Sequence, residues 1–121
     1  MGKVVLDAVM DAALNEVKNN ATTLHVCALQ PTDRADAISK SLASVAITGV
    51  DFTLANGDAS GRKSTCAAQT GISIGSSGDA DHIAVIDGTR LLVVTTCATQ
   101  TLTSGGTVDT NAWDHEIADA V

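Results

Sequence analysis

The stretch that decides the fold is DADHIAVIDGTRLLVVTTC, residues 79–97. It holds two apolar runs rich in Val, Ile and Thr, 82–86 and 91–96, separated by Asp-Gly-Thr at 87–89. An Asp-Gly turn between two such runs is the strongest short-range indication of a β-hairpin, so the runs are predicted to pair antiparallel. Residues 91–94 are apolar on both alternating faces, which predicts a strand covered on both sides. We therefore expect this hairpin to form the centre of the core.

The length and composition predict one small domain with a thin core. A chain of 121 residues buries about two thirds of its unfolded surface, and we expect residues 1–121 to form a single β-sandwich domain. Only Phe52 and Trp113 are aromatic, so the core must be built from small aliphatic side chains. Apolar burial contributes about 25 cal/mol per Å². A core of small side chains therefore favours a homo-oligomer or a larger assembly.

The charge pattern limits the classes of partner. Lys and Arg total 7 and Asp and Glu total 14, a net charge of −7, and the basic residues are scattered. Nucleic-acid binding depends on a basic stripe, and attachment to an anionic membrane depends on a polybasic segment. Every apolar run is far shorter than the ~20 residues of a membrane-spanning helix, and the sequence begins without a signal-peptide pattern. We expect neither nucleic acid nor a membrane as partner, and synthesis in the cytoplasm.

An amphipathic helix is predicted over residues 4–19. Its apolar residues recur at helical spacing, with polar residues on the opposite side. The apolar stripe consists of Leu6, Val9, Met10, Ala13, Leu14 and Val17. This stripe packs on the sheet or docks on a neighbouring subunit.

About eight short strands are predicted between residues 22 and 118, with closely spaced turns. Pro31 ends the first strand, and a short helical turn is possible within 33–41. The predicted strands are 22–29, 45–47, 50–54, 62–70, 72–74 with a junction at Gly71, the two hairpin arms with the second continuing through 95–102, and one or two strands in 107–117. No strand–helix alternation is present. The fold class is therefore mainly β, an antiparallel β-sandwich or jelly-roll-like barrel with one N-terminal amphipathic α-helix.

One motif matches that of serine hydrolases. Residues 71–75, GISIG, fit the G-x-S-x-G pattern, which requires a strand, a strained turn exposing the serine, and then a helix. Here a loop follows, and Ser73 alternates with isoleucines as an outward strand residue does. We interpret Ser73 as a plain strand residue and predict that the chain is not an enzyme.

Two acidic clusters and three cysteines are the other candidates for chemistry. The clusters, 79–87 and 114–116, are interpreted as solvated acids, with a bound cation as the alternative, because EF-hand and zinc spacings are absent. His25, alone in an apolar strand, is interpreted as a surface or hydrogen-bonded core residue. The cysteines Cys27, Cys66 and Cys97 lack metal-ligand spacing and are predicted to be free thiols. No cofactor is expected.

The order of parts resembles a group of small virion proteins of tailed bacteriophages. The shared parts are an opening helix ending DAALNEVKNNAT, a Gln-Pro-Thr turn, GDASGRK at 57–63, HIAVIDGTRLLVVT at 82–95 and TLTSGGTVDTNAWDHEIAD at 101–119. They cover nearly the whole chain and contain no catalytic signature. The resemblance implies an accessory part of the capsid or of the head-to-tail region, with no functional residue to carry over.

The leading hypothesis is a capsid decoration or cement protein on the virion surface. Its expected partners are the major capsid protein and copies of itself, a trimer being one option, after synthesis in the host bacterial cytoplasm. The alternatives are a head-to-tail or tail-associated structural protein and a small carbohydrate-binding or host-recognition module. The candidate contact residues are Val4, Val5, Arg62, Lys63 and Trp113, and Trp113 is equally suited to the core.

Overall fold

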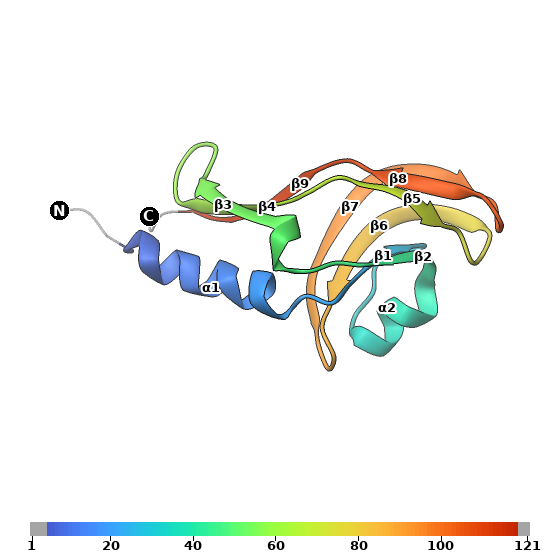
Figure 1. Cartoon of the computed structure of the whole chain (residues 1–121), viewed down its shortest axis with the longest axis horizontal. Coiled ribbons are helices and arrows are strands. Elements are labelled where there is room, and N and C mark those ends of the chain that lie inside the picture. Colours follow the sequence, from blue (N-terminus) through green and yellow to red (C-terminus); the bar gives the residue numbers. More distant parts are fainter. Residues whose placement is uncertain (1–4, 119–121) are drawn as a thin grey trace.

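A computed structural model describes residues 5–118 (Figure 1). The described chain is mainly β with antiparallel pairing, which confirms the predicted fold class. Its elements in order are α1 (Asp7–Asn20), β1 (Thr23–Cys27), α2 (Arg34–Lys40), β2 (Ser41–Ala46), the 3-10 turn η1 (Gly49–Asp51), β3 (Phe52–Asn56), β4 (Arg62–Cys66), β5 (Gln69–Ser73), β6 (Gly78–Ile86), β7 (Leu91–Leu102), β8 (Thr107–Thr110) and β9 (Trp113–Ile117).

The strands form three sheets that nearly join. One sheet has the order β2-β1-β6-β7, a second β3-β4-β9, and β5 pairs with β8. β5 follows β4 in the chain, and β9 follows β8. Since β4 pairs with β9 and β5 pairs with β8, residues 62–73 and 107–117 form one long two-stranded ribbon. Figure 1 shows this ribbon above the curved four-stranded sheet. A bridge between Ala43 and Ile74 links β2 to β5, so the wall continues from β7 around to β8.

The predicted hairpin is confirmed, but its second arm is not the centre of the core. β6 and β7 pair antiparallel, and β6 lies inside the sheet with residues 83–86 buried. β7 is an edge strand, and residues 91–94 are only half-buried. Periodicity shows that both faces of a strand are apolar. It does not show which arm of a hairpin has a neighbour on its outer side.

Both faces of the four-stranded sheet are apolar because both are covered. On one face Leu24, Val26 and Val85 pack in the main core with Phe52 of β3. The other face contributes to a second cluster, which lies against α2 and consists of Cys27, Ala37, Ala84 and Ile86. The half-buried residues of β7 divide between the two cores, which explains their two-sided apolar pattern.

The helix α1 covers the β3 and β4 side of the domain (Figure 1). Lys18 Nζ near its end donates to the carbonyl oxygens of Gly49 at 2.7 Å and Phe52 at 2.6 Å. The carboxylate of Asp11 accepts from Arg62 Nε of β4 at 2.8 Å. On the side of α1 that faces the domain, Met10, Leu14 and Val17 are buried.

Several predicted boundaries were wrong. The helix begins at Asp7 rather than residue 4, and Val4 lies outside the described residues. The break between β4 and β5 falls at Ala67 and Ala68, which carry no turn signal, whereas Gly71 lies inside β5 with φ +66° at a register shift. A glycine therefore marks an irregularity within the strand here rather than its end.

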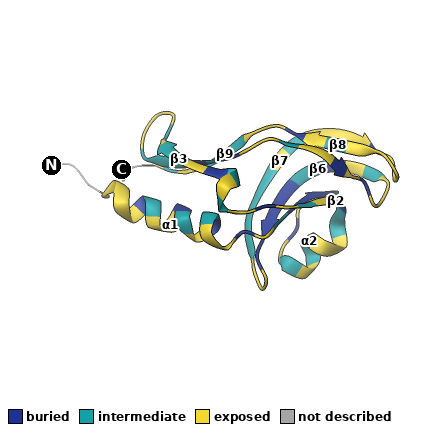
Figure 2. Ribbon diagram, viewed as in Figure 1, coloured by how far each residue is buried: buried dark blue, intermediate teal, exposed yellow. Residues whose placement is uncertain are grey.

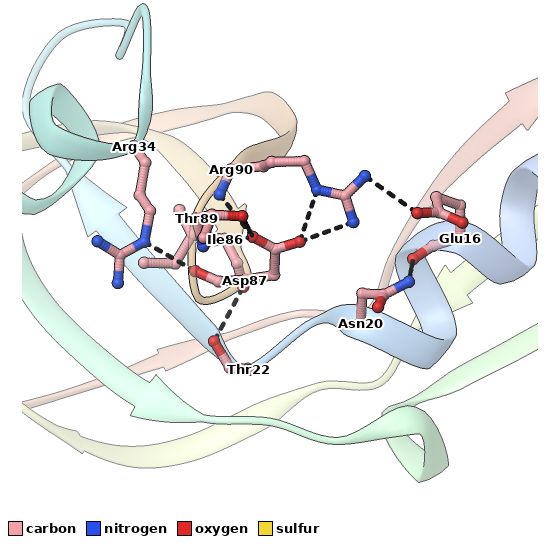
Figure 3. Close-up of polar contacts among 8 residues, drawn as sticks. All are labelled: Glu16, Asn20, Thr22, Arg34, Ile86, Asp87, Thr89 and Arg90. Atoms are coloured by element: carbon pink, nitrogen blue, oxygen red, sulfur yellow. Dashed lines mark hydrogen bonds and ion pairs between the residues drawn. The ribbon is translucent and has the colours of Figure 1, made fainter.

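The hairpin turn is held by a carboxylate (Figure 3). Asp87 Oδ1 accepts from the backbone N–H of Thr89 at 2.8 Å and from that of Arg90, and Oδ2 accepts from Arg90 Nε at 2.8 Å. These bonds, that of Thr89 first, lower the pKa of Asp87 to about 2. Gly88 does not adopt a positive φ, so the turn does not use the left-handed glycine that an Asp-Gly pair suggests.

The same turn ties both helices to the sheet. Arg34 Nε of α2 donates to the carbonyl oxygen of Asp87 at 2.8 Å, and Arg90 Nη1 lies 3.0 Å from Glu16 Oε1 of α1 (Figure 3). Thr22, between α1 and β1, donates its backbone N–H to the carbonyl of Ile86 at 2.9 Å. The end of β6 and the turn after it therefore contact α1, α2 and the segment between α1 and β1.

Val85 and Val93 are cross-strand partners with unequal burial, and we expect unequal costs on truncation. Val85 is fully buried, so Val85→Ala should lower the free energy of unfolding by about 2 kcal/mol through lost burial and a cavity. Val93→Ala at the half-exposed edge should cost about half of that or less. Urea unfolding of both variants measures the difference. Equal costs would contradict the edge position of β7.

Asp87→Asn should destabilise the protein, whereas Asp79→Asn should not. Asp79 is exposed and accepts one bond, from the Thr101 hydroxyl at 2.8 Å. Because the folded-state pKa of Asp87 lies below its ordinary 3.8, the contribution of this carboxylate is complete above that value and is lost as the pH falls towards about 2. Thermal unfolding should show a gap between wild type and Asp87→Asn at pH 7 that closes in this acid range. A gap independent of pH would refute the role of the charge.

Candidate functional site

Two of the predicted contact residues are engaged within the chain. Arg62 forms an ion pair with Asp11, as described, and Arg62 Nη1 donates to Asn56 Oδ1 at 2.9 Å. Lys63 Nζ lies 2.7 Å from Asp58 Oδ1 and 3.3 Å from Asp114 Oδ2. These bonds raise the pKa of Lys63. Both cations already have carboxylate partners and brace β4 against α1, the 57–61 loop and β9.

Trp113, the third predicted contact residue on the body of the domain, is half-buried at the start of β9. It packs against the main core, and its ring centroid lies 5.8 Å from that of His115. It also lines a groove of about 340 Å³ between β7 and the segment from β8 to β9. Trp113 therefore contacts the core and also lines a surface groove, in keeping with both roles that the sequence left open.

The groove follows two strand edges. Its walls include residues 95–98 of β7 and six consecutive residues, 108–113, on the other side. The register between β6 and β7 shifts between Thr96 and Gln100, so side chains there do not alternate regularly, and Asn111 and Ala112 lie between β8 and β9. β7, β8 and β9 are each the outermost strand of a described sheet, so both edges beside the groove lack a backbone partner.

The groove has an apolar floor and few charges. Val26, Ile83 and Leu102 contribute to its floor, and Asp109 is the one charged residue among those that line it. The Thr110 hydroxyl and the Trp113 indole N–H are enclosed without a hydrogen-bond partner in residues 5–118. Thr110 is only 7% exposed, and buried polar groups of this kind are normally paired. Because both atoms are enclosed by protein, they lie behind the lining of the groove and not on its surface.

A second exposed feature is the start of α1. Val5, the predicted contact residue that the structure describes near the N-terminus, is 36% exposed. Leu6 and Val9, which belong to the predicted apolar stripe, are 66% and 60% exposed. Figure 2 shows this end of α1 as exposed surface. The predicted stripe is thus only partly covered by the sheet.

The acidic clusters do not converge on one point. Asp79 accepts from Thr101, Asp81 Oδ1 accepts from the Leu29 N–H at 2.8 Å, and Asp87 holds the turn. Residues 5–118 contain no group of three His, Cys, Asp or Glu side chains placed to hold a metal ion. Each of these carboxylates serves a local structural bond.

His25 and Ser41 form a pair beside a second groove of about 320 Å³ that also reaches Ser73. His25 Nδ1 lies 2.8 Å from Ser41 Oγ, which is 3.1 Å from the carbonyl oxygen of Ala43. The hydroxyl has one proton, so both bonds form together only when Nδ1 donates. That direction is opposite to the one that activates a nucleophile. Ser73 is an exposed residue of β5, and no helix follows it up to residue 118.

The three cysteines are free thiols, as predicted. Cys27 and Cys66 are buried, and burial raises the pKa of each to about 11. Cys97 of β7 is half-buried, and burial raises its pKa as well. Because each pKa is raised, all three thiols are protonated at neutral pH.

Comparison of the chain with protein-family models, curated proteins and solved structures found no match. Within residues 5–118 no helix has the length and apolar character needed to cross a bilayer.

Because the ring nitrogens of His115 are buried, we expect the protein to lose stability in mild acid. Its ring packs between Phe52 and Trp113 with both nitrogens enclosed and unpaired, and burial lowers its pKa. A folded-state pKa below the ordinary 6.5 means that the unfolded chain takes up the proton first, so the free energy of unfolding should fall as the pH drops below about 6.5. His115→Leu should reduce this fall in denaturant titrations at pH 7.5 and 5.5. An unchanged pH dependence would rule out His115 as its source.

Proposed function

We propose that this chain is a structural protein of a tailed-bacteriophage virion, a capsid decoration protein that binds and stabilises the major capsid shell as a homo-oligomer. The resemblance of its sequence parts supports the phage setting. The structural observation that carries the binding role is the exposed apolar row on α1. In this proposal the chain acts at the capsid surface by contact alone and uses no cofactor.

The helix α1 has two apolar rows, and only one is covered. Met10, Leu14 and Val17 are spaced by four and three residues and are buried against the domain. Val9 and Ala13 are likewise spaced by four residues and remain exposed, as does Leu6, the extended residue directly before the helix. Residues three and four apart lie on one side of a helix. We call Leu6, Val9 and Ala13 the α1 outer row.

The outer row is suited to contact with another protein. It lies toward the N-terminal end of α1, which projects beyond the sheets in Figure 1, so a flat partner surface can reach it. Single exposed apolar residues are normal, whereas a continuous row on a domain of net charge −7 is a feature of interaction surfaces. Burial of a Leu or Val side chain contributes about 1.5–3 kcal/mol. Two such residues are enough to make attachment depend on the row.

The position of the protein on the particle tests the proposal. Cryo-electron microscopy of the source virion should show its density at repeated lattice positions of the shell. The copy number per particle should be that of a lattice component. A single ring at the portal or tail would replace the decoration role by that of a head-to-tail protein.

The double variant Leu6→Ser, Val9→Ser should lower the affinity for purified shells lacking the protein by at least about tenfold, since the lost burial exceeds 1.4 kcal/mol. Val50→Ser on η1 is the matched control, because Val50 is apolar and 88% exposed but lies away from the outer row. Co-sedimentation with shells measures both. Equal binding by the two variants would eliminate the outer row as the contact.

A further inference from the structure

We propose that Asn56 is a self-modifying residue, whose side-chain amide is lost while the linkage to Gly57 becomes a mixture of aspartyl and isoaspartyl forms. The reaction is an intramolecular acyl transfer that consumes water and releases ammonia. It uses only groups of this chain and does not depend on the proposed binding function.

The reacting groups belong to neighbouring residues. The backbone nitrogen of Gly57 is the nucleophile, and the carbonyl carbon Cγ of the Asn56 side chain is the electrophile. As the new N–Cγ bond forms, the Cγ–Nδ2 bond breaks and Nδ2 leaves as ammonia, the Gly57 nitrogen having given up its proton. Water then opens the resulting five-membered succinimide ring at either carbonyl, which gives the aspartyl or the isoaspartyl form. Groups held this close in one chain react far faster than separate molecules.

The fold requires a glycine directly after Asn56. β3 ends at Asn56, and the loop of residues 57–61 returns the chain to β4. A Cβ atom at position 57 would lie 2.0 Å from the carbonyl oxygen of Ser60 and 3.0 Å from Glu116 Oε2. Packing therefore excludes a side chain here. The same absence removes the steric hindrance that a side chain at position 57 would offer to attack by its nitrogen.

The surroundings of the amide favour the reaction. Asn56 is exposed, and its Oδ1 accepts from Arg62 Nη1 at 2.9 Å. Negative charge develops on this oxygen when the nitrogen attacks, and a guanidinium N–H directed at it stabilises that charge. The Gly57 N–H donates to the carbonyl oxygen of Gly61 at 2.9 Å, so this bond must open before attack. It lies at the end of a hairpin, where local opening costs least.

The chain contains a second pair of the same kind, Asp87-Gly88, which the structure protects. The Asp87 carboxylate accepts from the backbone N–H groups of Thr89 and Arg90 and from Arg90 Nε. These bonds, that of Thr89 first, lower the pKa of Asp87 to about 2, so the group is ionised at neutral pH. An ionised carboxylate is a poor electrophile. We therefore expect modification at Asn56 and none at Asp87.

The modification falls beside an anchor of α1. Asn56 and Arg62 are cross-strand partners, and Arg62 Nε bonds to the Asp11 carboxylate of α1 at 2.8 Å. The aspartyl form places a second carboxylate on Arg62, and the isoaspartyl form adds a carbon atom to the backbone at this pair. Both products therefore alter the contact through which β4 holds the helix.

Peptide mapping by mass spectrometry tests the proposal on the purified, folded chain during prolonged incubation at pH 7.5. We expect progressive replacement of the side-chain –NH2 of Asn56 by –OH, with aspartyl and isoaspartyl peptides separated by chromatography. Asn111 is the internal control, because it is also exposed in a short connection but is followed by Ala112. Its conversion should be several-fold slower, since the alanine methyl group hinders attack.

The variant Asn56→Gln makes the test specific, because its longer side chain would have to close a less favourable six-membered ring. Each modified wild-type chain gains one negative charge, so isoelectric focusing should resolve an acidic species that Asn56→Gln lacks. Three results would overturn the proposal: an Asn56 that stays intact in the folded chain and converts only in urea, equal rates at Asn56 and Asn111, and an acidic species that persists in Asn56→Gln. The shell experiments with the α1 outer row are independent of all three.

Discussion

The rest of the structure depends on the carboxylate of Asp87. It closes the β6–β7 turn through the N–H groups of Thr89 and Arg90, and this geometry directs Arg90 towards Glu16 of α1. The carbonyl of the same residue holds Arg34 at the start of α2. In a domain with one Phe and one Trp, the core supplies few large contacts. A polar junction at one turn therefore positions both helices on a sheet that packs with small side chains.

The domain is also asymmetric in how its sheet edges are treated. The bridge to β5 covers β2, α1 lies against β3, and acidic residues protect β9. The edge of β7 has no charged residue, and its pairing with β6 is made irregular by two shifts of register. Leu6 and Val9, at the start of α1, are apolar residues that the rest of the described chain leaves exposed.

The sequence predicts which segments form helices and strands better than it predicts which strands lie side by side. The stripe at 6–17 and the Asp-Gly turn correctly give a helix and a hairpin, because both signals are local. The edge position of β7 depends on which strand adds outside the hairpin, and no local pattern encodes it. Trp113 is a candidate from the sequence because it is the one large apolar side chain in an otherwise polar segment. Its groove was missed, because residues 95–102 and 108–113 meet only after the long ribbon folds back over the sheet.

That ribbon also sets the order in which the domain is able to fold. The β6–β7 hairpin joins neighbours in sequence, but residues 62–66 pair with 113–117, about fifty residues further along the chain. Contacts of such separation form slowly, since loop closure costs entropy before pairing restores it. On the ribosome, β4 has no β9 partner until residues 113–117 have emerged. The four-stranded sheet is thus complete in sequence by residue 102, before the strands β8 and β9 that form the other wall of the groove.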